Sequence, residues 1–260
     1  MNVIFSKYHC LGRDFILLDN RNGAFEALQP AEISRLCARR FGIGASGILR
    51  LDDVSKKSTN VTAFNFNGAL AEFNVVDAAC VAVFVKNSGT LPASKIKINE
   101  QTVCCKLVSN HENMHFVTIQ IPEPILIKKS FQNFVMDYGT PLCMVPTDDV
   151  SKIDVVEKGR EISYHKKRFP KGANVTFYQP HHDFLEIRHY EYQADQETYT
   201  NGLCVIGAAL SHAQNISDDR CLVRTKGGEM QVSFERSNDA FCNVELKVLV
   251  NEVYEGKVRK

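Results

Sequence analysis

The chain has 260 residues, 44% of them hydrophobic and 23% charged, a composition typical of globular proteins and not of disordered ones. Its 31 Lys and Arg residues face 30 Asp and Glu residues, so the net charge of +1 gives no reason to expect nucleic acid or a membrane surface as a partner. The start, MNVIFSKYHC, lacks the apolar core of a signal peptide, and no later segment has the length of a membrane span. We therefore expect a cytoplasmic protein.

The nine cysteines are an odd number and form no CxxC pair and no Cys/His cluster with zinc spacing. This pattern argues against a disulfide framework and against a structural metal site. We expect reduced thiols, most of them buried.

The first half of the chain alternates strand-like runs with turns. Pro30 suits the first turn of a helix that continues to about Arg39, and a glycine-rich loop, RFGIGASG, follows it. A strand ending near Phe66 leads into an apolar run opened by Asn74, which is a favourable N-cap, with Asp77 at a capping-box position. Because this run is apolar on all sides, it predicts a fully buried central helix. The apolar runs of this half lie at residues 3–8, 15–19, 75–85, 95–98, 103–108 and 116–121.

The segment Pro122-Glu123-Pro124 interrupts the pattern and is taken as the domain boundary, because closely spaced prolines favour an extended linker. A second helix is expected at 150–158. Asn201 then opens another run that is apolar all round, from Leu203 to Ala213, so the second half repeats the arrangement of the first. Strands are expected at 134–138, 142–145, 175–178, 184–190, 221–225, 229–234, 242–249 and 253–254.

Several segments together resemble the diaminopimelate epimerase family from end to end. They are FSKYHCLGRDF at 5–15, RFGIGA at 40–45, FNFNG at 64–68 followed by Ala71 and Glu72, RHYE at 188–191 followed by Glu197 and Thr198, KGG at 226–228 and VYEG at 253–256. The spacing is that of the family apart from a one-residue insertion between Glu191 and Glu197.

The resemblance implies an α/β (α+β) fold of two similar domains, each a barrel-like mixed β-sheet wrapped around a central buried helix. The domains implied are 1–121 plus 247–260, with the helix at 75–86, and 122–246, with the helix at 202–213. In the family the active site lies between the domains. A cysteine at the start of each central helix removes or returns the α-proton of an amino acid, without cofactor or metal.

The sequence departs from the family at both thiol positions. The first cysteine motif aligns with Asn74-Val75-Val76-Asp77 and the second with Asn201-Gly202-Leu203-Cys204. A carboxamide does not ionise near neutral pH, so the two-thiol reaction of the family cannot run here. The ligand positions differ as well: the loop asparagine is Arg13, a Gly-Asn-Pro-His segment is Gly139-Thr140-Pro141-Leu142, and an arginine is Tyr192.

The resemblance places two sets of residues at a ligand site. The candidates for catalysis or for a contact at the reacting group are Glu191, Asp77, Asn74 and Asn201. The candidates for substrate binding are Asn65, Asn174, Arg13, Thr140, Tyr192, Val75, Val76, Gly202 and Leu203. For Asn74 and Asn201, helix capping is the favoured role and is compatible with a ligand contact, and for Asp77 a capping role is favoured over that of an acid or base. Glu72 and Glu197 are weaker candidates, and Cys204 is expected to be an inert buried thiol.

Two classes of function remain open from the sequence. The first is a cofactor-independent isomerase of another kind, moving a proton or a double bond on an amino-acid-like or imino-acid-like small molecule, in specialised biosynthesis. The second is a non-catalytic paralogue that binds a small acid or a protein partner. Both imply a small-molecule or protein partner, no cofactor, no metal, no nucleic acid and no membrane, and both leave open whether a homodimer forms.

Overall fold

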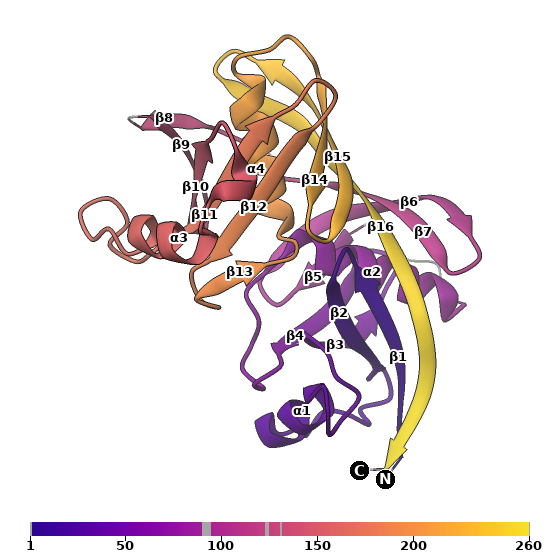
Figure 1. Ribbon diagram of the computed structural model, residues 1–260. Helices are drawn as coiled ribbons and strands as arrows, with labels where there is room; N and C mark the ends of the chain where they lie inside the picture. The colour runs from indigo at the N-terminus through magenta and orange to yellow at the C-terminus, as the bar shows by residue number, and fades with distance from the viewer. Residues whose placement is uncertain (1, 90–94, 123–124, 131, 260) are drawn as a thin grey trace. The chain divides into compact units, whose positions relative to one another are not determined.

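The computed structural model describes residues 2–89, 95–122, 125–130 and 132–259. These residues form sixteen strands, four α-helices and one short 3₁₀ helix (Figure 1). They divide into two compact units, residues 1–120 with 248–260 and residues 121–247. Of the prolines assigned to the boundary, Pro122 is described, whereas residues 123 and 124 lie outside the described residues. In the described part, no helix is long and apolar enough to cross a membrane.

The first unit is a closed barrel of eight strands. Its strand order is β1 to β7 followed by β16, and β16 pairs with β1 to close the ring. The pairs β2–β3 and β4–β5 are parallel and the others are antiparallel, so the sheet is mixed. The strands are β1 (Asn2–Cys10), β2 (Arg13–Asp19), β3 (Gly47–Val54), β4 (Thr59–Asn65), β5 (Lys95–Ile98), β6 (Gln101–His111), β7 (Met114–Gln120) and part of β16 (Ala240–Arg259).

Helix α2 (Val75–Asn87) fills this barrel and contacts β1, β3, β5, β6 and β7. Every residue from 75 to 85 is buried, because a helix that is apolar on all sides can be accommodated only where strands surround it. Helix α1 (Pro30–Cys37) is amphipathic and covers the outer face of the barrel, where Ile33 and Cys37 pack against Val3, Phe5 and Ile16. The predicted buried central helix is therefore present.

The glycine-rich loop after α1 needs its glycines for two different reasons. Gly44 has a φ of +79°, in the left-handed region that side chains disfavour. A Cβ on Gly47 would lie 2.2 Å from the carbonyl oxygen of Phe64, so only glycine lets β3 approach β4 at this point. The loop is thus a structural element of the barrel.

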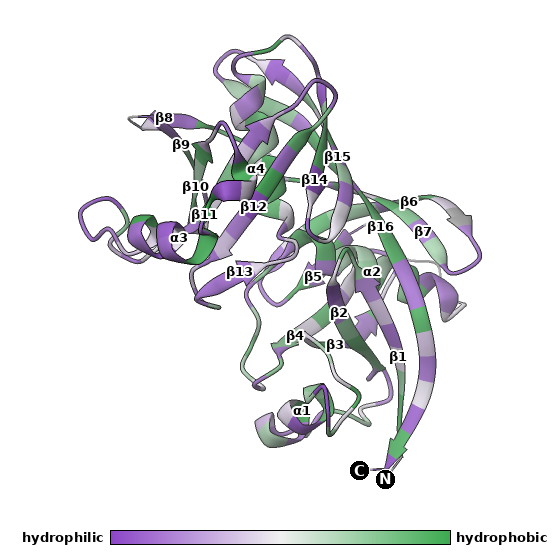
Figure 2. Ribbon diagram, viewed as in Figure 1, coloured by the Kyte–Doolittle hydropathy of each residue, from purple (hydrophilic) through white to green (hydrophobic). Residues whose placement is uncertain are grey.

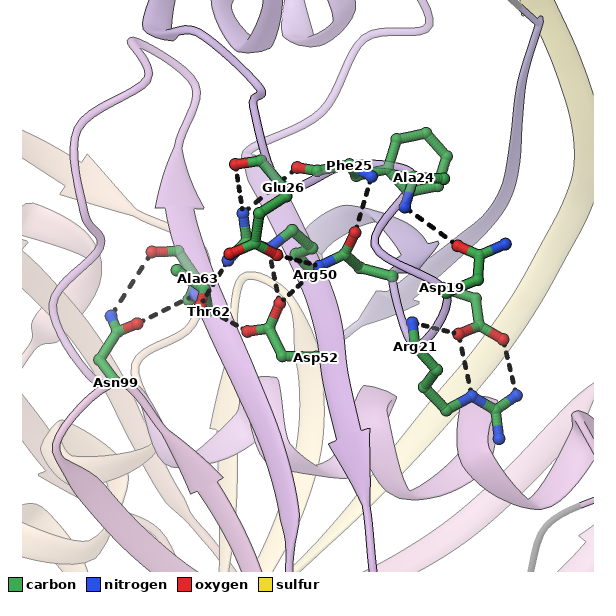
Figure 3. Close-up of polar contacts among 12 residues, drawn as sticks. Asp19, Arg21, Ala24, Phe25, Glu26, Arg50, Asp52, Thr62, Ala63 and Asn99 are labelled. Carbon is green, nitrogen blue, oxygen red and sulfur yellow. Dashed lines mark hydrogen bonds and ion pairs between the residues drawn. The ribbon is translucent and has the colours of Figure 1, made fainter.

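A network of polar side chains joins neighbouring strands of the same barrel (Figure 3). Asp52 accepts hydrogen bonds of 2.6 Å from Arg50 Nε and from Thr62 Oγ1, which joins neighbouring strands β3 and β4. Asn99 accepts a bond of 3.1 Å from the Ala63 amide. These polar side chains stabilise the barrel and belong to none of the motifs discussed above.

The second unit repeats the plan with a different strand order. The path runs β16, β15, β14, β12, β11, β10, β9, β8, and β13 pairs with β12. The pairs β10–β11 and β12–β14 are parallel. The strands are β8 (Lys128–Ser130), β9 (Asn133–Tyr138), β10 (Thr140–Pro146), β11 (Asn174–Pro180), β12 (Leu185–Glu191), β13 (Gln196–Thr198), β14 (Arg220–Thr225) and β15 (Gly228–Ser237), with residues 240–247 of β16.

Helix α4 (Gly202–Ala213) is the buried helix of this unit and contacts β9, β10, β11, β12, β14 and β15. Figure 2 shows it as predominantly hydrophobic. Helix α3 (Val155–Ser163) covers the outer face, where Val155 packs with Val175, Phe177 and Tyr190. Both units thus confirm the predicted fold class of a mixed sheet around a central buried helix.

The bounds of three predicted elements differ most from those in the structure. The helix expected at 150–158 is a 3₁₀ turn η1 (Val150–Lys152) followed by α3, because Asp154 caps a new helix by accepting a bond from the Glu157 amide. The strands expected at 242–249 and 253–254 are one continuous strand, β16, which has a bulge opposite Lys7 and Tyr8.

Candidate functional site

The start of α2 is capped by Asn74. Its side-chain oxygen accepts a hydrogen bond of 3.3 Å from the Val76 amide, and the residue is 4% exposed. The side chains of Val75 and Val76, whose backbone amides are the candidates for ligand binding, are fully buried. At this helix, the capping role suggested by the sequence is the one that the geometry displays.

Asp77, three residues after the cap, forms an ion pair with Arg13 from β2. The Arg13 Nε atom lies 3.0 Å from Asp77 Oδ1, and Nη2 lies 3.2 Å from Oδ2. The Asp77 side chain is 1% exposed and that of Arg13 is 20% exposed. A carboxylate in the first turn of a helix also interacts favourably with the helix dipole. The Asp77 carboxylate is therefore committed to a structural pair, and Arg13 is the more accessible partner.

Asn65 ends β4 and stands at the turn that leads toward α2. Its backbone N–H donates a hydrogen bond of 2.8 Å to the Ala69 carbonyl, and its backbone carbonyl accepts one of 2.9 Å from the Gly68 N–H. The side chain is half-buried. The structure thus places Asn65 in the unit that holds Asn74, Asp77 and Arg13.

The start of α4 is organised differently, because Asn201 has two partners. Its Oδ1 atom accepts from the amides of Leu203 and Cys204 at 3.1 and 3.2 Å. Its Nδ2 atom donates to Glu191 Oε1 at 2.7 Å. Glu191 is the last residue of β12 and is half-buried. Within the described residues, no hydrogen bond reaches its other oxygen, Oε2.

The strand register explains which side chains accompany Glu191. Thr176 on β11 pairs with His189 on β12, and Val175 pairs with Tyr190. Because side chains alternate along a strand, Asn174, Thr176, His189 and Glu191 lie on the face opposite the Tyr190 side chain that packs toward α3. A polar row thus lies beneath the first turn of α4.

Sequence reasoning did not single out His189 or Thr176. His189 is 1% exposed, and its Nε2 atom lies 2.8 Å from Thr198 Oγ1. Thr176 lies two positions after Asn174 and His189 two positions before Glu191, on the same strands. The alternation of side chains along β11 and β12 is therefore the signal that could have found them.

Cys204 is fully buried in the first turn of α4. Burial raises the pKa of its thiol to about 12, since a thiolate without water is unfavourable. A thiol with this pKa is protonated at neutral pH and is not a base.

In the described part of the chain, no hydrogen bond links the side chain of Tyr192 or of Thr140 to the Glu191 carboxylate. The Tyr192 ring packs against Tyr164, with centroids 5.1 Å apart, and leaves no room for a Cβ on Gly172. Its backbone amide donates 2.9 Å to Asn174 Oδ1, which orients that side chain. Thr140 begins β10 after the Gly139 turn, and among the described residues no hydrogen bond links it to Glu191 or Asn201.

Glu197 is held between two cations. Arg188 reaches its oxygens at 2.7 and 2.9 Å, and Lys226 Nζ lies 2.7 Å from Oε2. Burial alone would raise the pKa of this carboxyl, but the hydrogen bonds from Arg188 and Lys226 outweigh burial and hold it below its usual range. The motif residues Arg188, Glu197 and Lys226 thus fasten β13 and the β14–β15 turn to β12. Glu72, the other weak candidate, is exposed.

Among the described residues, no group of three or more His, Cys, Asp or Glu side chains is placed to hold a metal ion. Two arrangements therefore stand out chemically. One is the Arg13–Asp77 pair at the start of α2. The other is a partly exposed carboxylate, Glu191, anchored by a carboxamide at the start of α4.

Comparison with known proteins gives a consistent result. No family model matches the chain. A diaminopimelate epimerase from Methanocella arvoryzae is 29% identical over 98% of this chain and 96% of that protein. Among solved structures, a PhzF-family phenazine biosynthesis protein from Bacillus anthracis superposes with a TM-score of 0.69 at 11% identity over the full length of both chains.

A hydroxyproline epimerase from Agrobacterium vitis, solved with trans-4-hydroxy-L-proline bound, has the same TM-score of 0.69 at 12% identity over 99% of this chain and 91% of that one. These structural likenesses show the fold. Proteins named diaminopimelate epimerase are similar to this chain over nearly its full length, and the chain carries Asn74 and Asn201 at the two positions that the resemblance aligns with cysteines of that family.

Proposed function

We propose that the chain is a cofactor-independent isomerase that moves a proton on an amino-acid-like or imino-acid-like small molecule, with Glu191 as the base. The observation that carries the proposal is the bond from Asn201 to Glu191 Oε1, which leaves Oε2 directed to neither a cation nor a backbone amide among the described residues. A general base needs a fixed position and an accessible oxygen, and Glu191 has both.

The arrangement favours chemistry with a single base. Epimerisation requires a proton to leave one face of a carbon and another to arrive at the opposite face, which in the related family takes two groups. A shift of a double bond requires only one: Glu191 takes a proton from a carbon next to the double bond and returns it two carbons away as the electron pair moves. The anion formed between these steps is delocalised. We therefore favour a double-bond isomerase over a racemase.

Other residues of the second unit would assist. The helix dipole and first-turn amides of α4 favour negative charge that develops near Asn201. Asn174, oriented by its bond to the Tyr192 amide, supplies a polar contact on the Glu191 face. Taken by itself, the first unit offers Arg13 as a candidate for binding a carboxylate, because its guanidinium is pre-oriented by Asp77 and partly exposed. The names of the related epimerases, and the hydroxyproline bound in one neighbour, support the amino-acid class.

A second candidate function is a non-catalytic paralogue that binds a small acid. The observation favouring it is the Arg13–Asp77 pair: the one carboxylate in the first turn of α2 is neutralised, and Asn74 supplies a cap instead of an acid or a base. Under this alternative, Arg13 would bind the carboxylate of a ligand that is never converted.

A single experiment separates the two candidates. The purified protein is incubated in D₂O with a panel of amino acids, cyclic imino acids and β,γ-unsaturated acids, and proton exchange and double-bond shifts are followed by NMR. We expect one member to show a double-bond shift, and Glu191→Gln to abolish it, by about 10²–10⁴-fold. Glu186→Gln is the matched control, because it removes an exposed carboxylate from the same strand that bonds His181 instead of Asn201.

The outcomes are distinct. Turnover that survives Glu191→Gln would show that another group is the base. Absence of turnover across the panel, combined with ligand-induced thermal stabilisation that persists in Glu191→Gln and is lost in Arg13→Gln, would establish the binding paralogue.

A further inference from the structure

A cluster of basic residues in the second unit takes no part in the candidate site. It consists of Lys128, Lys129, Lys166, Lys167, Arg168 and Lys171, and is called here the basic patch. The two stretches that supply it, 125–136 and 162–182, contain no Asp or Glu. Since these are six of the 31 basic residues, the other 25 face 30 acidic residues in the rest of the chain. A nearly neutral protein thus concentrates positive charge in two stretches of its chain.

The structure holds the two stretches together. Arg168 Nη2 donates 3.1 Å to the Ser130 carbonyl, which ties the loop after α3 to the end of β8. The Arg168 guanidinium also lies over the ring of the buried residue Phe169, 5.2 Å from its centroid. Figure 1 places β8 and the loop after α3 on the same side of this unit, and Figure 2 shows both as hydrophilic. The contacts of Arg168 therefore hold together the two backbone segments that carry the lysines.

The five lysines are exposed, and in the described part of the chain none of them forms an ion pair. Lysines on a short edge strand also prevent unwanted pairing, and β8 is such a strand. That role accounts for Lys128 and Lys129. It does not account for Lys166, Lys167 and Lys171, which lie in a loop.

The chemistry of the patch distinguishes between anionic partners. Its exposed cations are lysines, which act as point charges, whereas its one arginine is half-buried and bonded to Ser130. Tyr164 packs on Tyr192, so it does not offer both faces for stacking on a base. These features give little means of reading nucleic acid.

By contrast, the same two stretches expose one large apolar side chain, Leu126 at 51%, and one tyrosine, Tyr164 at 41%. Clustered lysines accompanied by exposed apolar and tyrosine side chains suit the interface of a membrane that contains anionic lipids. We infer that the basic patch is a docking surface for an anionic lipid bilayer, on which the protein binds peripherally. Lys128, Lys129, Lys166, Lys167 and Lys171 supply the attraction, and Leu126 enters the interface.

Co-sedimentation with vesicles tests the inference. The protein should bind vesicles of phosphatidylcholine mixed with phosphatidylserine and not vesicles of phosphatidylcholine alone, and binding should weaken as salt rises from about 0.05 M to about 0.5 M. Replacing the five lysines by Gln should weaken binding by at least about tenfold. The matched control replaces five exposed lysines of the first unit, Lys56, Lys57, Lys95, Lys106 and Lys257, and should bind as the unchanged protein does.

Three results would overturn the inference: no binding to the mixed vesicles, equal loss of binding in the control variant, or binding to a single-stranded oligonucleotide without binding to vesicles. Far-UV circular dichroism and the unfolding midpoint establish that the variants are folded. If the five-lysine variant does not fold, the variant confined to Lys166, Lys167 and Lys171 leaves β8 unaltered and must still lose at least about threefold in binding.

Discussion

The Asn201 side chain donates a hydrogen bond of 2.7 Å to Glu191 while its oxygen caps α4. One carboxamide thereby joins the helix start to the carboxylate at the end of β12. A cysteine could not do both, because a thiol is a weak donor and a weak acceptor. An asparagine at residue 201 therefore fixes Glu191 and, because a carboxamide does not ionise near neutral pH, exchanges no proton itself.

Removing this side chain should destabilise the protein measurably. Asn201→Ala deletes an acceptor for two amides and the donor to Glu191, so we expect the free energy of unfolding to fall by about 1–2 kcal/mol. Asn74→Ala deletes an acceptor for one amide at 3.3 Å and should cost about 1 kcal/mol or less. Urea unfolding measures both. An Asn201→Ala variant as stable as the unchanged protein would show that the cap contributes nothing.

The buried helix of the first unit should not tolerate charge. Val81 is 1% exposed in the middle of α2, and a carboxylate there would have no water and no designed partner. Val81→Asp should abolish soluble expression, whereas Val81→Ala should remain soluble and lose about 1–3 kcal/mol. Lys106→Asp, on the exposed face of β6, is the control and should be well tolerated. Normal expression of Val81→Asp would contradict the burial of α2.

Asp14 should make the fold sensitive to acid. Burial opposes its ionisation, but hydrogen bonds from Arg39, Lys7 and Ser46 outweigh burial and hold the pKa well below the usual 3.8. Since the pKa is lower in the folded than in the unfolded chain, Asp14 contributes stability that is complete above about pH 4–5 and declines as the pH falls further.

Asp14→Asn should therefore lower the free energy of unfolding, measured with urea at pH 7, by about 2–4 kcal/mol relative to the unchanged protein. This difference in free energy should shrink toward about pH 2–3. Asp239→Asn, in the exposed β15–β16 turn, serves as the comparison. A difference that stays constant with pH would mean that the Asp14 pKa is not depressed.

The cysteines should fall into two classes of reactivity. Seven are buried, and two, Cys104 and Cys242, are partly exposed. Burial raises the pKa of Cys204 to about 12 and that of Cys80 well above its ordinary value. Iodoacetamide at neutral pH should therefore modify Cys104 and Cys242 first and leave Cys204 unmodified until the protein unfolds. Peptide mass spectrometry reads the result, and rapid labelling of Cys204 would show that the start of α4 opens.

The central helices could be predicted from the sequence because a helix that is apolar on all sides is stable only when it is buried on all sides. A run such as 75–85, apolar on every side and opened by a good N-cap, must be surrounded by other chain. The strand at 47–54 was not foreseen, since its second half carries Arg50, Asp52 and Asp53, whose charges are accommodated by the Asp52 network and by solvent. This segment forms a strand because it pairs with β2 and β4. The local sequence pattern does not reveal that pairing.

The site was predictable in its residues more than in its contacts. Asn201 and Glu191 were both identified as candidates. The hydrogen bond between them depends on where the end of β12 lies relative to the start of α4, which no local pattern specifies. The Arg13–Asp77 pair likewise joins positions 64 apart in the chain. His189 was overlooked because a single histidine in a buried strand resembles an ordinary core residue.

The last prediction concerns the reaction of the related family. We expect no measurable diaminopimelate epimerase activity, because both positions of proton transfer carry carboxamides and loss of a positioned acid or base typically costs 10²–10⁴-fold. Deuterium exchange at the α-carbon of diaminopimelate in D₂O is the direct assay. The double variant Asn74→Cys, Asn201→Cys restores the thiols, yet it should remain inactive, because the buried Val75 and Val76 side chains and the Arg13–Asp77 pair still occupy the start of α2. Exchange in the double variant at rates typical of an enzyme would show that the two asparagines alone separate this chain from its relatives, and that the pair is no obstacle.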